Sequence, residues 1–116
     1  MAESKKYEIT VTADTQYLAD QSDPQDGRYV FAYHITLRNT GTIAAQLISR
    51  HWVITDAESH VQEVRGLGVV GHQPLIKPGE SFEYSSGCVL TTPVGTMRGS
   101  YQMTAEDGTQ FEAPVA

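Results

Sequence analysis

Hydrophobic and polar residues alternate one by one along most of this chain. In the clearest case, residues 29–38, aromatic and aliphatic side chains at odd positions are separated by smaller or more polar ones at even positions. A period of two residues is typical of β-strands that bury one face. The pattern predicts seven strands, over residues 7–12, 29–38, 46–55, 60–65, 81–90, 96–105 and 111–115.

Turn-forming residues stand between these segments. Residues 20–27 are acidic and include a proline and a glycine, which predicts a mobile loop. Shorter turns are predicted at residues 39–41, 56–59, 78–79 and 106–109. Seven short strands without a credible helix predict an all-β fold, an antiparallel β-sandwich of seven to eight strands and of immunoglobulin-like or fibronectin type III-like kind. A small barrel is the alternative. The Cys–Trp–Cys signature of antibody domains is absent, so the prediction rests on the pattern alone.

The length of 116 residues predicts a single domain over residues 1–116, large enough to bury its own core. The longest apolar runs have only a few residues, so no membrane span is expected. No apolar stretch follows the two lysines near the start, so no secretory leader is expected either. The single cysteine excludes an internal disulfide and is typical of a reducing compartment. We therefore expect a cytoplasmic protein.

The charge of the chain argues against nucleic acid as a partner. Fourteen acidic residues outnumber eight basic ones, which gives a net charge of −6. The basic residues are scattered along the sequence, whereas a surface that binds duplex nucleic acid normally clusters Lys and Arg against the phosphates. An extended nucleic-acid-binding surface is not expected.

Three glycines, Gly66, Gly68 and Gly71, have the spacing of a dinucleotide-binding motif. That motif needs a helix directly after the glycines, because the helix N-terminus holds the pyrophosphate. Pro74 and Pro78 follow instead, and each pushes the preceding residue out of the α region. The glycines are therefore predicted to lie in a loop of a β protein. Such a loop either permits a bulge or a positive φ, or exposes N–H groups for an anion, aided by the positive charges of Arg65, His72 and Lys77.

The sequence offers little for a metal site or for catalysis. Its four histidines and one cysteine have no partners at the spacing that would place two ligands on one face of a strand. His51 and His60 would approach each other if their two strands pair across the turn at 56–59. Cys88 has no nucleophile signature around it, and no serine lies in a Gly-x-Ser-x-Gly elbow. We predict no metal-ligating residues, no cofactor and no catalytic residues. The histidines and cysteine are His34, His51, His60, His72 and Cys88.

The third predicted strand carries the residues most suggestive of binding. Alternation divides it into two faces, with Ile48, Arg50, Trp52 and Ile54 on one and Leu47, His51 and Val53 on the other. Trp52 is expected in the core, which leaves His51 facing outward or into the next layer. Arg50 then shares the core face, where it lies at the edge of the strand, stacks on an aromatic ring or pairs with an acid such as Glu83.

Taken together, these motifs resemble the ApaG family over nearly the whole chain. The matching segments are SRHW (49–52), ITD (54–56), VRGLGVVG (64–71), QP (73–74), PGESF (78–82), Tyr84, SG (86–87), TP (92–93), Gly95, Met97, Gly99, Tyr101 and Phe111. The resemblance implies a fibronectin type III-like sandwich in a bacterial cytoplasmic protein with no established catalytic residues. It also implies a link by name to cobalt and magnesium homeostasis without a defined metal site. The family pattern usually continues past Pro114 into a short Phe-containing tail, and this chain stops at Ala116.

Similar domains in eukaryotes are fused to F-box proteins and to a polymerase-delta-interacting protein, which implies a protein-interaction module. We predict a non-enzymatic binding module for an unidentified protein partner, with its surface at residues 66–77 and the neighbouring turn at 93–95. Edge strands offer a second route, to a partner or to a second copy of the chain. The alternative is a small-ligand site for a diphosphate, a nucleotide or a divalent cation at residues 66–71. The residues predicted to contribute are Arg65, Gly66, Gly68, Gly71 and His72 for a ligand, and Arg50, His51, Lys77 and Pro93 for a partner.

Overall fold

The structure is a computed structural model that describes residues 6–69 and 71–115. The expectations about a leader and about the final residue concern residues 1–5 and 116, which lie outside the described residues. Within the described ranges the chain forms eight strands and two short 3₁₀ turns, with no α-helix. The strands are β1 (Ile9–Tyr17), β2 (Tyr29–Asn39), β3 (Ala45–Asp56), β4 (Val61–Leu67), β5 (Leu75–Ile76), β6 (Ser81–Leu90), β7 (Gly95–Ala105) and β8 (Gln110–Pro114).

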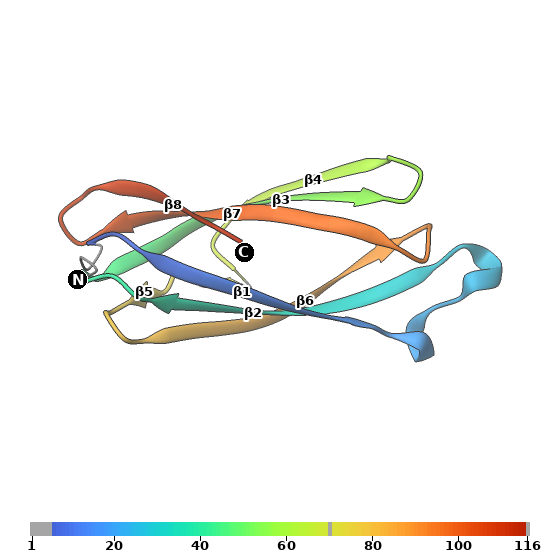
Figure 1. Ribbon diagram of the computed structural model, residues 1–116, viewed down its shortest axis with the longest axis horizontal. Helices are drawn as coiled ribbons and strands as arrows, with labels where there is room; N and C mark the ends of the chain where they lie inside the picture. Colours follow the sequence, from blue (N-terminus) through green and yellow to red (C-terminus); the bar gives the residue numbers. More distant parts are fainter. Residues whose placement is uncertain (1–5, 70, 116) are drawn as a thin grey trace, which may run out of the picture.

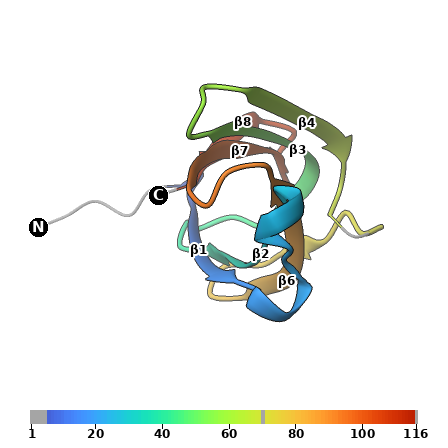
Figure 2. The same cartoon turned by 90° about the vertical axis from the view of Figure 1, so that its right-hand side faces the viewer.

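The strands form two antiparallel sheets that lie face to face (Figure 1). One sheet has the order β1-β2-β6, and the other has the order β4-β3-β7-β8, with the short β5 pairing the start of β3. An isolated bridge between Val11 and Val115 links the two sheets on one side. On the other side β4 and β6 are the outermost strands of their sheets, and Figure 2 shows them at the same border. The antiparallel β-sandwich is confirmed, while its assignment to the immunoglobulin or fibronectin kind stays a prediction.

The core between the sheets is built from the inward-facing residues of both. Tyr84 of β6 and Tyr101 of β7 join the two sheets through a short hydrogen bond between their hydroxyl groups, and their rings meet edge to face. Trp52 of β3 packs against Tyr101 in a T-shaped contact, with ring centroids 6.0 Å apart. Its buried Nε1 makes no hydrogen bond to a described residue. The most deeply buried residues are Val11, Ile35, Leu37, Asn39, Leu47, Val69, Ile76, Tyr101 and Met103.

The predicted division of β3 into two faces is wrong at its start. Leu47 is fully buried, although simple alternation from Trp52 places it on the outer face. The cause is a β-bulge, because Leu47 pairs with Met103 and Ser49 pairs with Gln102, which leaves Ile48 without a partner on β7. A bulge inserts one extra residue and shifts the alternation by one position. Leu47, Arg50 and Trp52 therefore all face the interior of the sandwich.

Two smaller differences concern segments with weak signals. Strand β1 continues to Tyr17, beyond the predicted end at residue 12. The two-residue strand β5 lies inside the segment predicted as a loop, where it pairs with Ala45 and Gln46. Among the described residues between 71 and 80 there is no helix. The prediction that no helix follows the glycines is therefore confirmed.

Candidate functional site

The free edge of β4 presents unpaired backbone groups. Gly68 donates its N–H to Ile48 O on β3, and at the other end of the hairpin Asp56 donates its N–H to His60 O. In an antiparallel pair the hydrogen-bonded positions alternate, so even-numbered residues of β4 point their backbone groups toward β3. The odd-numbered residues from 61 to 67 therefore point their N–H and C=O groups away from the sheet. No described strand pairs with β4 on that side.

Arg50 crosses β4 to reach this edge. It is the direct partner of Gly66 on the interior face of the sheet. Its guanidinium atoms lie 3.0 Å from the position that a β-carbon on Gly66 would occupy, so the missing side chain makes the room. Its Nη1 donates to Gly68 O at 2.6 Å and to Leu67 O at 3.3 Å. Since the carbonyl of Leu67 belongs to the free edge, the guanidinium lies where a further strand would begin.

The positive charge of Arg50 is not balanced by an acid. Among the described residues no carboxylate lies within 4 Å of its guanidinium, and its Nε and Nη2 groups donate to none of them. Of the three arrangements predicted for Arg50, the pairing with Glu83 is wrong. Arg50 lies in the middle of β3, and its guanidinium reaches the free edge of the neighbouring strand β4. Glu83 accepts one hydrogen bond from Thr36, and its carboxylate lies 3.3 Å from the ring of His34 on the outer face of the other sheet.

A groove of about 300 Å³ opens beside Arg50, between β4 and β6. Arg50 and Trp52 line one wall from β3, Val64 borders it from β4, and Ser86 and Cys88 line the opposite wall from β6. Burial raises the pKa of the Cys88 thiol, so this cysteine does not have the environment of an activated nucleophile. The groove thus combines aliphatic and aromatic walls with one uncompensated cation.

Aliphatic side chains are exposed along the same edge. Leu67 is 76% exposed, Val61 is 61% exposed and Val64 is 38% exposed, all on β4. Leu75, just after the following loop, is 55% exposed. Sequence reasoning missed these residues. One signal was visible in Leu67, which stands between two glycines, because a glycine neighbour shields little of a side chain. Together they give the free edge an apolar character that the outer strands of monomeric sandwiches usually avoid.

The loop between β4 and β5 is tied firmly to the sandwich. Its Val69 is fully buried, and Val69 and His72 exchange backbone hydrogen bonds of 2.8 Å in both directions. Gly68 has φ of +63°, and a β-carbon there would stand 2.3 Å from His72 O. The N–H groups of Gly68, Val69 and His72 thus all donate to carbonyls of the protein, which leaves them turned away from any anion.

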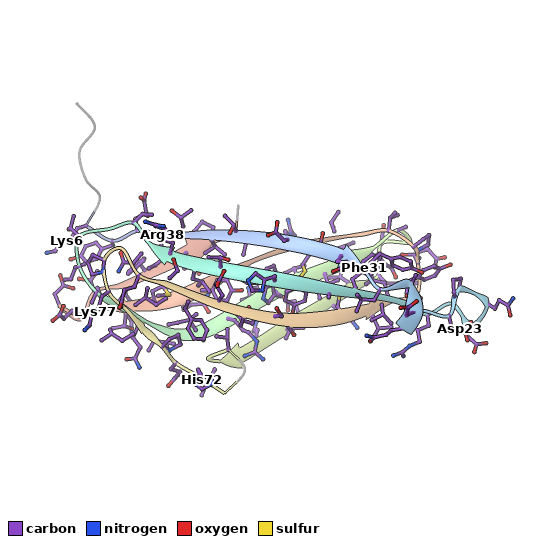
Figure 3. The ribbon with its side chains drawn as sticks, turned by 90° about the horizontal axis from the view of Figure 1, so that it is seen from below. Lys6, Asp23, Phe31, Arg38, His72 and Lys77 are labelled. Atoms are coloured by element: carbon purple, nitrogen blue, oxygen red, sulfur yellow. The ribbon has the colours of Figure 1, made fainter. Side chains whose placement is uncertain are left out.

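The residues predicted to add positive charge to this loop do not converge. The side chain of Arg65 lies on the outer face, where Arg65 and His51 both contact Glu63 at 3.7 and 3.2 Å. The ring of His72 packs edge-on near Phe82 of β6, with centroids 6.4 Å apart. Figure 3 shows His72 at the border of the molecule and Lys77 at one of its ends. The predicted cluster of Arg65, His72 and Lys77 is therefore wrong in its geometry.

Pro93 is also placed differently from expectation. The turn that contains it lies beside the end of β3, where Gly95 pairs with Asp56 and the side chain of Thr92 accepts the N–H of Ala57. The loop that begins at Gly68 contacts the start of β3 instead. The two segments lie at opposite ends of β3, so they do not form the single surface that was predicted.

The sequence and fold of this chain match those of known proteins. The family model described as ApaG domain matches residues 19–105. The chain belongs to the ApaG family. Protein ApaG of Thiobacillus denitrificans is 70% identical over 115 residues, covering 99% of this chain and 91% of that protein. Protein ApaG of Nitrosospira multiformis is 66% identical with the same coverage. The crystal structure of the putative ApaA protein from Bordetella pertussis superposes with a TM-score of 0.96 at 58% identity, covering 98% of this chain and 93% of that one.

The names of these ApaG relatives state no activity. In the described part of this ApaG-family chain, no group of three or more His, Cys, Asp or Glu residues is arranged to hold a metal ion. His51 and His60 do not form the shared site that was considered from the sequence. His51 contacts Glu63, and His60 contacts Asp56. No helix among the described residues is long and apolar enough to cross a membrane.

Proposed function

We propose that this ApaG-family domain is a protein-binding module that takes an extended segment of a partner protein as an additional strand along β4. The observation that carries the proposal is the free edge of β4, whose odd-numbered residues turn their backbone N–H and C=O groups outward. Strand addition uses such groups for affinity and the alternating side chains for specificity. The exposed aliphatic side chains of Val61, Val64 and Leu67 supply apolar area for the added strand.

A foreign partner fits this edge better than a second copy of the chain. If two copies paired through β4, the interior-facing residues contributed by the second copy would be Gln62, Val64 and Gly66. None of these carries a carboxylate, so the charge of Arg50 would stay uncompensated in such a dimer. Measurement of mass by analytical ultracentrifugation distinguishes the two, since pairing through β4 predicts a dimer in the absence of any partner.

The module binds without catalysing a reaction, and it does so in a reducing compartment. The absence of an activated thiol supports the first point, since burial raises the pKa of Cys88. The same unpaired cysteine supports the second point. A link to cobalt or magnesium homeostasis would then act through the bound partner, because the described residues offer no group of ligands for a cation.

Hydrogen exchange in the presence of a peptide tests the proposal. The probe is an acetylated and amidated nine-residue peptide in which Val and Thr alternate. We expect the amide hydrogens of Glu63 and Arg65, which point away from β3, to gain protection as the peptide binds. The amides of Gln62 and Val64 already bond to β3 and should change little.

The matched control is Arg65→Pro, which removes one outward N–H and leaves the bonds between β3 and β4 in place. Pro at an outward position is tolerated at sheet edges, so the variant should unfold at nearly the same urea concentration as the wild type. It should bind the peptide more weakly. Protection that appears along β6 instead, or that is absent from β4 at saturating peptide, would exclude strand addition at this edge.

A further inference from the structure

The positive charge of Arg50, on the interior face of the β4 edge, has no acidic partner among the described residues. The chain is acidic overall, with a net charge of −6, yet no carboxylate of the described residues pairs with Arg50. The neighbouring Arg65, on the outer face of the same edge, has Glu63 within 3.7 Å. The two arginines therefore differ in that only Arg50, partly buried beside the groove, lacks an acidic partner within the described part of the chain. A partly buried charge without a partner is costly unless a ligand completes it.

The geometry of the guanidinium limits what completes it. Nη1 is held by the carbonyls of Leu67 and Gly68, which fixes the plane of the group. The edge formed by Nε and Nη2 donates to no described residue. Two parallel N–H groups of this kind match the two oxygens of a carboxylate and form the stronger, bidentate type of ion pair. The free donors therefore favour a carboxylate over a neutral amide.

The position of this carboxylate follows from the register of the sheet. Gly66 points its backbone groups toward β3, so a residue opposite it on an added strand forms a non-hydrogen-bonded pair with it. In such pairs the side chains are closest, and both lie on the same face. Strands are about 4.8 Å apart, so the guanidinium lying over Gly66 reaches the side chain of that opposite residue. Gly66 thus serves as an opening through which Arg50 contacts the next strand.

We propose that the partner segment carries Asp or Glu opposite Gly66, and that Arg50 reads it from the groove between β4 and β6. This inference rests on the proposed strand addition at β4 and specifies its partner. Two positions away on the same face, the added strand lies opposite Val64, whose exposed side chain favours an aliphatic residue there. The recognised pattern is an extended segment with an acid and an aliphatic residue two positions apart.

The test compares three versions of the nine-residue peptide, which differ only at the fifth position, where they carry Glu, Gln or Lys. In all three, the nearest residues on the same face of the peptide strand are Val. We expect the Glu peptide to bind the wild-type protein roughly tenfold more tightly than the Gln peptide, and the Lys peptide to bind most weakly. Affinities are measured by isothermal titration calorimetry at constant ionic strength, and the Nε–H signal of Arg50 is followed by NMR. That signal should shift with the Glu peptide and not with the Gln peptide.

The matched variants are Arg50→Gln and Arg65→Gln, which remove the same charge from the two faces of one edge. Arg50→Gln should abolish the preference for Glu, and Arg65→Gln should keep it. Arg50→Lys retains the charge and loses the fork, so it should keep only part of the preference. Urea unfolding of each variant shows whether the fold is retained, and the peptide comparison on the wild-type protein needs no variant.

Two failures can be told apart. Equal binding of the Glu and Gln peptides, with protection along β4, would overturn the acidic partner and leave strand addition standing. A preference for Glu that persists in Arg50→Gln would also overturn the role of Arg50 and leave strand addition standing, because another residue would then bind the carboxylate. If none of the peptides binds at millimolar concentration, the proposals of strand addition at β4 and of an acidic partner segment are both wrong.

Discussion

The guanidinium carbon of Arg50 lies 3.0 Å from the place where a β-carbon on residue 66 would stand. This relationship joins two residues on neighbouring strands that the sequence separates by a turn. It gives Gly66 a role that does not depend on an unusual backbone conformation, since its φ is not positive. Gly68, two residues later, does require a positive φ. The two glycines therefore predict different consequences for the same substitution.

Gly66→Ala should preserve the fold and impair recognition. The added methyl group meets the end of a flexible side chain, so Arg50 can move and the loss of unfolding free energy should stay below about 1 kcal/mol. The displaced guanidinium no longer reaches the added strand in the same way. We expect the preference for the Glu peptide over the Gln peptide to shrink, as measured by calorimetry. An unchanged preference would show that Arg50 does not act across Gly66.

Gly68→Ala should instead destabilise the protein. Its β-carbon would meet the backbone oxygen of His72 at 2.3 Å, and a non-glycine residue at positive φ adds strain of its own. We expect a loss of about 2–4 kcal/mol in urea unfolding, larger than for Gly66→Ala. Gly71→Ala is the control, because it has a positive φ with open space around it. A smaller loss for Gly68→Ala than for Gly71→Ala would contradict the contact with His72.

The tyrosine pair in the core should make the fold sensitive to alkaline pH. Burial, together with the hydrogen bond and charge of Tyr84, raises the pKa of Tyr101, and burial raises that of Tyr84. Unfolded tyrosines lose their protons near pH 10, whereas the folded pair retains them. The unfolded state therefore binds fewer protons above that pH, and the stability falls as the pH rises. The slope reaches about 1.4 kcal/mol per pH unit for each tyrosine.

Tyr101→Phe separates this effect from general alkaline unfolding. The variant should lose about 1 kcal/mol at neutral pH, because it removes a hydrogen bond between the sheets. Above pH 10 its stability should fall less steeply than that of the wild type. Parallel curves for Tyr101→Phe and wild type between pH 9 and 11 would rule out the pair as the cause.

Asp56 should protect the β3–β4 hairpin against acid. Burial by itself raises the pKa of this carboxyl. The backbone N–H groups of His60 and Glu58 and the side chain of His60 lower the pKa by more than burial raises it, so the net pKa lies below 3.8. Its stabilising contribution is therefore complete above pH 3.8 and is lost as the pH falls through the lower folded value. Carbon-detected NMR titration of the Asp56 carboxyl measures the shift. In Asp56→Ala the amides of Glu58 and His60 should exchange faster at pH 6, and Glu58→Gln should leave them unchanged.

Pyrophosphate should leave the loop between β4 and β5 undisturbed. The N–H groups of Gly68, Val69 and His72 already donate to carbonyls at 2.8 Å, so these three donors are not available to an anion. We expect no change in their amide NMR signals up to millimolar pyrophosphate, and none with magnesium or cobalt(III) hexammine as a diamagnetic probe. Saturable shifts of these amides at sub-millimolar concentration would restore the small-ligand alternative.

The sequence predicted the architecture because alternation is a local property. The long run of alternating residues in β2 and the glycine turn at 106–109 identify their structures without any distant contact. Within β3 the same rule failed at Ile48. The segment Gln46-Leu47-Ile48-Ser49 contains two adjacent aliphatic residues, so either one satisfies the pattern, and the pairing with β7 decides which one is buried.

The site was predicted less well than the fold, and the reason is again distance along the chain. Arg50 and Gly66 were both selected, but their contact depends on the register between β3 and β4, which no single strand reveals. The expected neighbourhood of Pro93 is wrong because the whole of β6, Ser81–Leu90, separates the two loops. The unbalanced charge of Arg50 depends on where every acidic side chain lies, which the composition cannot tell.

Each sheet is assembled from strands that the ribosome makes far apart in time. Strand β2 pairs with β6, and β3 pairs with β7. These central pairings can therefore form only after residues 81–105 have been synthesised. Until residues 81–105 have been made, the aromatic side chains of β2 and β3 therefore lack these partner strands. Pairings of this range fold slowly, which exposes the nascent chain to chaperones and to aggregation.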